Sequence, residues 1–151
     1  MARQTNIKAS IIINATPEQV WNALTDFENL KNWSSSFQGL QGKFEKNGDI
    51  EIVFKSPFGG QSKMKKKLFH FEEGKSFGWT GVFLMGMSDY HSHTLNELSD
   101  GRTEFIQTDE LQGGASFLLG KLIEKQMQKG YEVFNQELKT FVENKIKLSD
   151  E

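Results

Sequence analysis

The sequence predicts an α+β fold in which a curved, antiparallel sheet of seven strands wraps around one long C-terminal helix. Between residues 37 and 111, segments of alternating apolar and polar residues are separated by turn sequences such as KNGD at 46–49 and SDGR at 99–102, which is typical of strands paired in sequence. After the glycines at 113–114, apolar residues recur every three or four positions, which is typical of one face of a helix. Because such a sheet needs cover on one face, we expect this helix to lie across it.

The N-terminal part of the chain predicts one strand followed by a helix. The segment IKASIII, which starts at Ile7, is rich in β-branched residues and is typical of a strand. Thr16 is a good N-cap, Pro17 suits the first helical position, and Gln19 completes a capping-box pattern. A helix is therefore expected from Pro17 to about Thr25.

A second short helix, six strands and the long helix account for the rest of the chain. The short helix is expected at about 28–33, and the strands, joined by short connections into a meander, at 40–45, 49–55, 61–72, 75–83, 89–98 and 102–111. The apolar connection GVFLMGMS at 81–88 is expected to fold over something apolar. The long helix is expected from Phe117 to Lys145, roughly 43 Å at about 1.5 Å per residue. Nothing in the sequence divides the chain, so residues 1–151 are expected to form a single domain.

The composition excludes several classes of function. The formal net charge of −2 provides no basic field for binding nucleic acid. The absence of cysteine excludes disulfides, thiolate metal sites and cysteine nucleophiles. The N-terminus MARQTNIKAS has no apolar signal segment, and no run approaches the ~18 apolar residues of a membrane helix. We therefore expect a cytoplasmic protein that is not integral to a membrane, and we leave its oligomeric state open between monomer and homodimer.

The lysine-rich segment at 63–67 is expected to belong to the outer face of the sheet. Alternation along a strand places Lys63, Lys65 and Lys67 on one side, opposite Met64, where lysines are solvated and discourage edge pairing. Lys66 shares the side of Met64 and is expected near the mouth of a cavity.

The aromatic content predicts an apolar interior with room for a ligand. The 13 Phe and 3 Trp must be buried or line an apolar space, and a curved sheet that grips one helix leaves such a space between them. Gly130, on the inner face of the long helix, suggests close approach to the sheet or room for a ligand. The residues expected to bind the ligand are Trp33, Phe37, Phe58, Met64, Trp79, Phe83, Met85, His91, His93, Leu95, Phe105, Gln107, Leu119, Ile123, Met127 and Phe134.

Two histidines in the segment YHSHT at 90–94 raise the possibility of chemistry. His91, His93 and Glu97 share one face of the predicted strand. A zinc site would need His70 as a third ligand, and the expected meander separates it from His91 by on the order of 20 Å along the strands, so no metal or other cofactor is expected. We expect His93 to offer one hydrogen bond to a ligand oxygen or to buried water. If the protein is an enzyme, His93 and Glu97 are the catalytic candidates, although roughly 13 Å of strand separates them.

Five segments of the chain resemble one family. They are SIIINATPEQVWNALTDFENLKNW at 10–33, FGWTG at 77–81, HTLNEL at 93–98, GRTEFIQTDELQGG at 101–114 and LLGKLIEKQMQKGYEVFNQELKTFVE at 118–143. Together they resemble the START/Bet v 1-like (SRPBCC) superfamily, and within it the bacterial branch similar to polyketide cyclases and dehydrases. The resemblance implies the helix-grip fold and places His93 where the family tends to keep a histidine. It implies no single activity, because the family includes lipid and steroid carriers, plant allergens, aromatase/cyclases and Hsp90-activator-like domains.

These observations together predict a binding protein. The expected function is that of a carrier or sensor for a small, largely apolar molecule, aromatic or lipid-like, held between the sheet and the C-terminal helix. One alternative is an enzyme similar to polyketide cyclases and dehydratases, against which weighs the absence of arginine from the expected cavity strands. The other alternative is an Hsp90-activator-like domain that binds a protein partner.

Overall fold

The computed structural model describes residues 5–56, 59–82, 86–114 and 116–150, with the main chain alone for Thr5 and residues 116–120. In chain order the elements are β1 (Thr5–Ile13), α1 (Pro17–Leu24), the 3-10 turn η1 (Leu30–Asn32), β2 (Phe37–Gly42), β3 (Asp49–Lys55), β4 (Gln61–Glu72), β5 (Ser76–Val82), β6 (Ser88–Glu97), β7 (Thr103–Gln112) and α2 (Ser116–Ser149). The seven strands of the described chain form one antiparallel sheet in the order β1-β7-β6-β5-β4-β3-β2.

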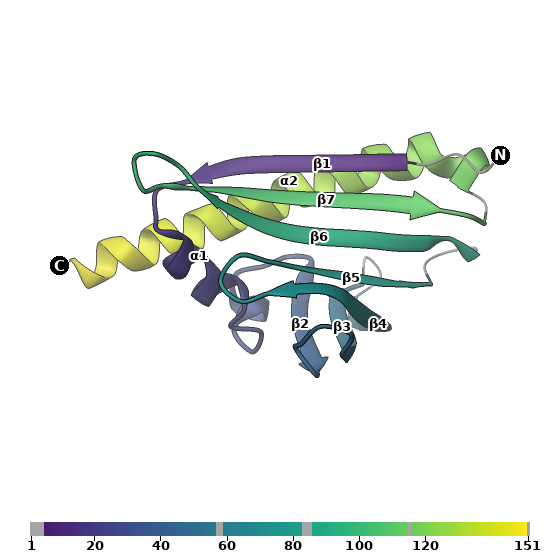
Figure 1. Cartoon of the computed structure of the whole chain (residues 1–151), viewed down its shortest axis with the longest axis horizontal. Coiled ribbons are helices and arrows are strands. Elements are labelled where there is room, and N and C mark those ends of the chain that lie inside the picture. Colours follow the sequence, from purple (N-terminus) through teal and green to yellow (C-terminus); the bar gives the residue numbers. More distant parts are fainter. Residues whose placement is uncertain (1–4, 57–58, 83–85, 115, 151) are drawn as a thin grey trace.

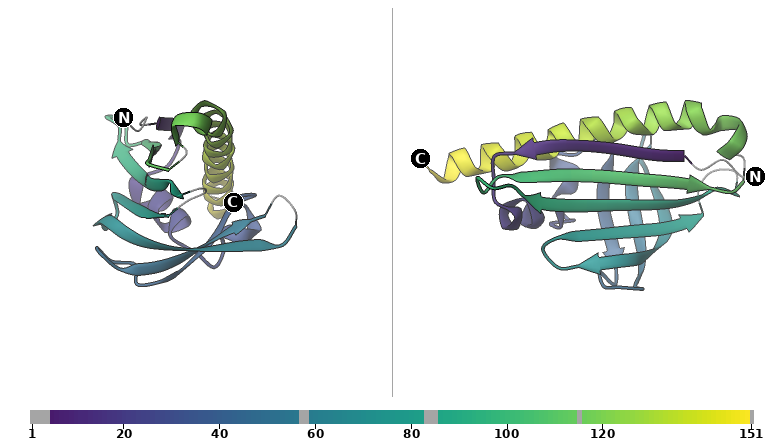
Figure 2. Two further views of the ribbon diagram at one scale, coloured as in Figure 1. Left: turned by 90° about the vertical axis from the view of Figure 1, so that its right-hand side faces the viewer. Right: turned by 45° about the horizontal axis from the view of Figure 1, so that its top comes forward.

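The sheet curves around α2, which confirms the predicted helix-grip fold. Helix α2 runs beside β1 for most of the length of the molecule (Figure 1). In the end-on view of Figure 2, the sheet bends away from β1 so that β2, β3 and β4 lie across from the helix. Helix α2 contains 34 residues and is longer than predicted at both ends. No helix in the described part of the chain is long and apolar enough to span a bilayer.

The first helix forms for the reason that the sequence indicates. The Thr16 side chain accepts a hydrogen bond from the Gln19 main-chain N–H, and the Gln19 side chain accepts one from the Thr16 N–H, which completes the capping box. The second short helix forms within the range predicted for it, but it is shorter than predicted and is the 3-10 helix η1. Its Asn29 N-cap makes no side-chain capping bond, and the main-chain N–H groups of Asn32 and Trp33 bond three residues back. The Ser34 N–H bonds four residues back to the Leu30 carbonyl at 2.7 Å, where the segment ends.

Strand β4 has the predicted bounds, whereas β2 lies three residues earlier than predicted. The first residue of β2, Phe37, pairs with Phe54 of β3, and the register of this strand pair shifts between Phe37 and Gly39. The strand ends at Gly42, which has a φ of 111°. A Cβ atom there would lie 2.4 Å from the main-chain oxygen of Asp49, so this position requires glycine.

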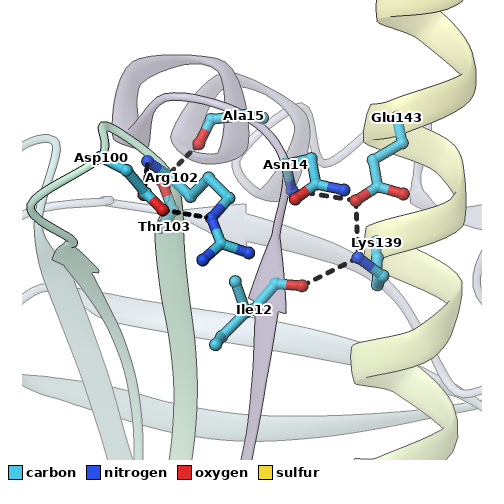
Figure 3. Close-up of polar contacts among 8 residues, drawn as sticks. All are labelled: Ile12, Asn14, Ala15, Asp100, Arg102, Thr103, Lys139 and Glu143. Atoms are coloured by element: carbon cyan, nitrogen blue, oxygen red, sulfur yellow. Dashed lines mark hydrogen bonds and ion pairs between the residues drawn. The ribbon is translucent and has the colours of Figure 1, made fainter.

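Polar contacts attach the C-terminal half of α2 to the end of β1 (Figure 3). The Lys139 ammonium donates to the Ile12 carbonyl at 2.9 Å, and the Glu143 carboxylate accepts from the Asn14 main-chain N–H at 2.9 Å. Lys139 and Glu143 also pair with each other at 2.6 Å. These contacts fix the position of the helix over the sheet, and so they define the space between the two.

The core fills the half of the interior that lies next to α1. Trp21 packs edge-on against Phe77 at a centroid distance of 5.8 Å, and Leu138 of α2 is fully buried among these residues. Leu95 of β6 and Phe105 of β7 belong to the same core. Beside the middle of α2, around Met127 to Phe134, the packing leaves a cavity.

Candidate functional site

A cavity of about 270 Å³ lies between the sheet and α2. Its wall is mainly apolar, with several polar groups, as is usual for binding sites of small molecules. The lining residues are Ser36, Phe37, Ile52, Phe54, Met64, Trp79, Asp89, His91, His93, Gln107, Met127, Gly130, Tyr131 and Phe134.

Aromatic rings form the apolar part of the wall. Phe37 meets Trp79 edge-on with centroids 5.2 Å apart, and it also contacts Phe134 of α2 at 6.2 Å. Phe54 lies beside Phe37 at 5.9 Å and meets Trp79 edge-on at 6.5 Å. Rings held in place by one another offer a preformed surface for a flat, apolar molecule.

Gly130 leaves the helix side of the cavity open. A Cβ atom at this position would meet no other atom within 4 Å. Glycine inside a helix costs roughly 1 kcal/mol relative to alanine. The chain therefore gives up helix stability at a place where an alanine side chain would enter the cavity.

A buried ion pair occupies the polar end of the cavity. The Lys66 ammonium of β4 lies 2.9 Å from both carboxylate oxygens of Asp89 on β6. The Gly81 main-chain N–H donates to the same carboxylate at 3.0 Å. Burial raises the pKa of Asp89 above its usual value, and Lys66 opposes this shift. The expectation that Lys66 lies near the cavity mouth is wrong, because its ammonium is completely buried.

A second carboxylate, Asp109 of β7, lies close to this pair. Its Oδ2 atom accepts a hydrogen bond from the Tyr131 hydroxyl of α2, and its Oδ1 atom is buried with no partner among the described residues. Burial raises the pKa of Asp109 to about 6, although the bond from Tyr131 acts in the opposite direction. Burial, with the nearby Asp109 charge, also raises the pKa of Tyr131 well above its usual value.

His91 is the first member of a hydrogen-bonded chain that crosses from the sheet to the helix. Its Nε2 atom lies 2.8 Å from the side-chain oxygen of Gln107 on β7. The Gln107 amide nitrogen lies 2.7 Å from the side-chain oxygen of Asn135 and 3.4 Å from the main-chain carbonyl of Tyr131, both on α2. Burial lowers the pKa of His91 to about 4, so the ring is neutral at pH 7.

His93 lies deeper than His91 and has fewer polar neighbours. Its ring stacks on Phe77 at 4.6 Å and lies 4.4 Å from the His91 ring. The Nδ1 atom is buried without a hydrogen-bond partner among the described residues. Burial and the neighbouring His91 lower the pKa of His93 well below its usual value, against a smaller opposing effect of the Phe77 main chain. The ring is therefore neutral, with an unused polar atom.

The structure brings half of the expected ligand-binding residues together in the cavity wall. These are Phe37, Met64, Trp79, His91, His93, Gln107, Met127 and Phe134. Leu95 and Phe105 lie in the core instead, Trp33 stacks on Phe141, and Ile123 is half-buried on α2 away from the lining. Phe58, Phe83 and Met85 lie outside the described residues, and Leu119 lies where the main chain alone is described.

Several lining residues escaped the sequence reasoning although the sequence holds signals for them. Asp89 has the same strand parity as His91 and His93, and Tyr131 follows Met127 by one helical turn. Phe54 follows the apolar Ile52 by two positions on β3. Ser36 precedes β2 and offers no periodic signal, so a loop position such as this one could not be predicted.

Two expectations about polar side chains need correction. Glu97 is exposed at the end of β6, so it does not face the cavity with His93. His70 is not displaced along the strands as expected, since it pairs with Gly78, which pairs with Ser92. A register shift between Leu68 and His70 instead turns His70 toward the outer face, where its Nε2 lies 2.6 Å from the Ser76 hydroxyl. The described residues contain no group of three or more His, Asp or Glu side chains that could hold a metal ion.

Comparison with known proteins supports the fold and identifies a sequence family. The family model described as "Polyketide cyclase / dehydrase and lipid transport" matches residues 4–143. No curated protein matches the chain by sequence.

Solved structures share the fold at low sequence identity. A protein of unknown function from Staphylococcus aureus is 14% identical over 97% of this chain and 98% of its own, with a TM-score of 0.75. The Zhui aromatase/cyclase from a Streptomyces species is 9% identical over 95% of this chain and 96% of its own, with a TM-score of 0.73. Ara h 8.0201 is 13% identical over 94% of this chain and 99% of its own, with a TM-score of 0.69.

Proposed function

Because the chain belongs to the polyketide cyclase / dehydrase and lipid transport family, we propose that it binds a small, largely apolar molecule in the cavity between the sheet and α2, as a carrier or sensor. The observation that carries this proposal is the open space beside Gly130. Protein interiors are normally close-packed, and an alanine here would both fill space and stabilise the helix. A cavity kept open at this cost is best explained by a ligand that occupies it.

The shape and chemistry of the wall favour a flat ligand with one polar end. Phe37, Trp79 and Phe134 offer ring surfaces, and Met64 and Met127 can adapt to ligands of different outline. His93 is expected to bond a polar group of the ligand or a buried water, since a buried ring atom without a partner costs free energy.

An enzymatic function remains a second candidate because of the Tyr131–Asp109 pair. A carboxyl with a pKa of about 6 beside an apolar cavity has the protonation behaviour of an acid–base catalyst. His93 is less suited to that role, since its lowered pKa makes it a weak base at pH 7. The third alternative is an Hsp90-activator-like domain, for which we expect a filled interior. The cavity argues against this alternative.

Mass spectrometry of the purified protein, first under native conditions and then after denaturation and solvent extraction, tests the proposal. We expect a bound small molecule, or, for an empty protein, binding of flat aromatic or lipid ligands that changes Trp79 fluorescence. Gly130→Leu should strongly weaken binding because its four added carbons enter the cavity, while Gly130→Ala, a matched control, adds one carbon and should retain most of the binding. Absence of both a bound molecule and any response in such a screen would contradict the proposal.

A further inference from the structure

The charges at the polar end of the cavity do not balance. Asp89 and Asp109 supply two carboxylates, and among the described residues Lys66 is the cation that acts on both. Lys66 already contacts both oxygens of Asp89. An anionic group that enters this end therefore meets an excess of negative charge in surroundings that screen it poorly.

The direction of the hydrogen bonds at His91 follows from the helix backbone. The Tyr131 main-chain carbonyl can only accept, so the Gln107 group 3.4 Å from it is the amide nitrogen and not the oxygen. The Gln107 oxygen then faces His91 Nε2, which must carry the proton. Because the His91 ring is neutral and its Nε2 proton is used for Gln107, its Nδ1 atom is an acceptor.

The Tyr131 hydroxyl also presents an acceptor to the cavity. Its proton is committed to Asp109 Oδ2, so its remaining capacity is that of the oxygen lone pairs. Three donors at this end are equally committed: the Lys66 ammonium and the Gly81 N–H to Asp89, and the Gln107 amide to α2. The Asn135 amide nitrogen is buried without a partner among the described residues, but Asn135 does not line the cavity. Ser36 can either donate or accept, and neutral His93 has one nitrogen of each kind, so neither changes the balance.

From this arrangement we propose that the cavity selects ligands whose polar group donates a hydrogen bond, such as a phenolic or alcoholic hydroxyl or an amine, and discriminates against carboxylates. The inference rests on the proposed function, because it specifies which molecules the same cavity accepts. A donor on the ligand can bond His91 Nδ1 or a remaining lone pair of Asp89 or Tyr131, whereas an acceptor on the ligand depends on donors such as Ser36 and His93 in the lining.

A series of naphthalene derivatives tests this selectivity on the full chain. Calorimetric titration would compare 2-naphthol, 2-methoxynaphthalene and 2-naphthoate at pH 7.5, with naphthalene as the parent compound. Methylation removes the donor but keeps the oxygen, so we expect 2-methoxynaphthalene to bind roughly tenfold more weakly than 2-naphthol despite its larger apolar surface. The carboxylate should bind more weakly still, by roughly a hundredfold.

Two charge variants test whether Asp109 causes the discrimination against carboxylates. Asp109→Asn removes the excess charge and keeps an oxygen for the Tyr131 hydroxyl, so the preference for 2-naphthol over 2-naphthoate should narrow roughly tenfold. Asp49→Asn makes the same change of net charge at a side chain that is 88% exposed, and it should leave the preference unchanged.

The possible outcomes separate this inference from the proposed function. Equal binding of 2-naphthol and 2-methoxynaphthalene, or stronger binding of 2-naphthoate, would overturn donor selection while leaving ligand binding intact. If none of the four compounds binds, the proposed function fails for flat aromatic ligands, and the inference fails with it. The wild-type series decides the question even if Asp109→Asn does not fold.

Discussion

The interior contains buried charged residues as well as many aromatic rings. Lys66 and Asp89 are buried together, and a buried pair of this kind gains little net stability because both charges lose their hydration. Asp109 adds a carboxylate with one oxygen that lacks a partner among the described residues. Residues that cost stability in this way are typical of functional sites.

The cost of burying Asp109 can be measured directly. Its pKa is about 6 in the folded protein against an ordinary value of 3.8, so the folded state favours the protonated form. Ionisation above pH 6 therefore lowers the free energy of unfolding by about 3 kcal/mol, an upper estimate, at 1.36 kcal/mol per pH unit. We expect Asp109→Asn to be more stable than wild type by roughly 1–3 kcal/mol in urea unfolding at pH 7.5.

The exposed Asp49→Asn variant is the control for that measurement and should differ from wild type by less than about 0.5 kcal/mol. A loss of stability in Asp109→Asn would mean that the carboxylate is better solvated or better paired than the structure indicates.

Residue-level prediction from the sequence succeeded where alternation was complete and failed where the chain departs from it. On β7, the inward side chains Thr103, Phe105, Gln107 and Asp109 follow the predicted face. On β4, a register shift beyond Leu68 reverses the side on which His70 lies. No glycine or proline marks this shift, so the sequence carries no signal for it. The Lys66–Asp89 pair joins strands that are not neighbours, and such a contact requires a three-dimensional structure.

At the scale of elements, strong local signals predicted the two α-helices, whereas a weak signal corresponds to a 3-10 helix of three residues. The capping box at Thr16 predicted α1, and the apolar repeat predicted α2. The segment before β2 has no such signal at Asn29 and forms only the turn η1. The exact ends of α2 could not be predicted, because its last turns continue beyond the apolar repeat.

The contribution of the cap is testable by substitution. Thr16→Ala removes the oxygen that accepts from the Gln19 N–H, and it should lower the free energy of unfolding by about 1 kcal/mol. The matched control is Thr140→Ala on the exposed side of α2, where alanine is a better helix former and should be neutral or slightly stabilising. Thermal unfolding of both variants provides the comparison, and equal destabilisation would argue against a specific role of the capping box.

At the scale of the whole molecule, the buried groups determine how stability changes with pH. Burial lowers the pKa of His91 to about 4 and that of His93 well below its usual value, so the unfolded chain takes up protons below pH 6.5 while the folded protein does not. The stability contributed by the neutral rings is complete above pH 6.5 and is lost as the pH falls toward 4. Asp109 acts in the opposite direction, because its protonation below pH 6 favours the folded state.

These opposing effects predict that the free energy of unfolding falls less steeply between pH 6 and 4 in wild type than in Asp109→Asn. Between pH 6 and 4, wild type loses stability from the histidines but recovers part of it from Asp109. Asp109→Asn has no such recovery, so its free energy of unfolding should fall more steeply over this range. Urea unfolding at pH 7.5, 6 and 5 measures the two slopes, and parallel profiles would contradict the assignment of these groups.

The pairing of β1 with β7 has a consequence for how the protein is made. Ile13 at the end of the first strand pairs with Thr103, so the β1 partner emerges from the ribosome about 5–20 seconds later, at 5–20 residues per second. During this interval the isoleucine-rich first strand has no place in the sheet. Helix α2 is translated later still, and it supplies one side of the cavity. The nascent chain therefore cannot hold a ligand before α2 has been synthesised, and until then it depends on other protection from aggregation.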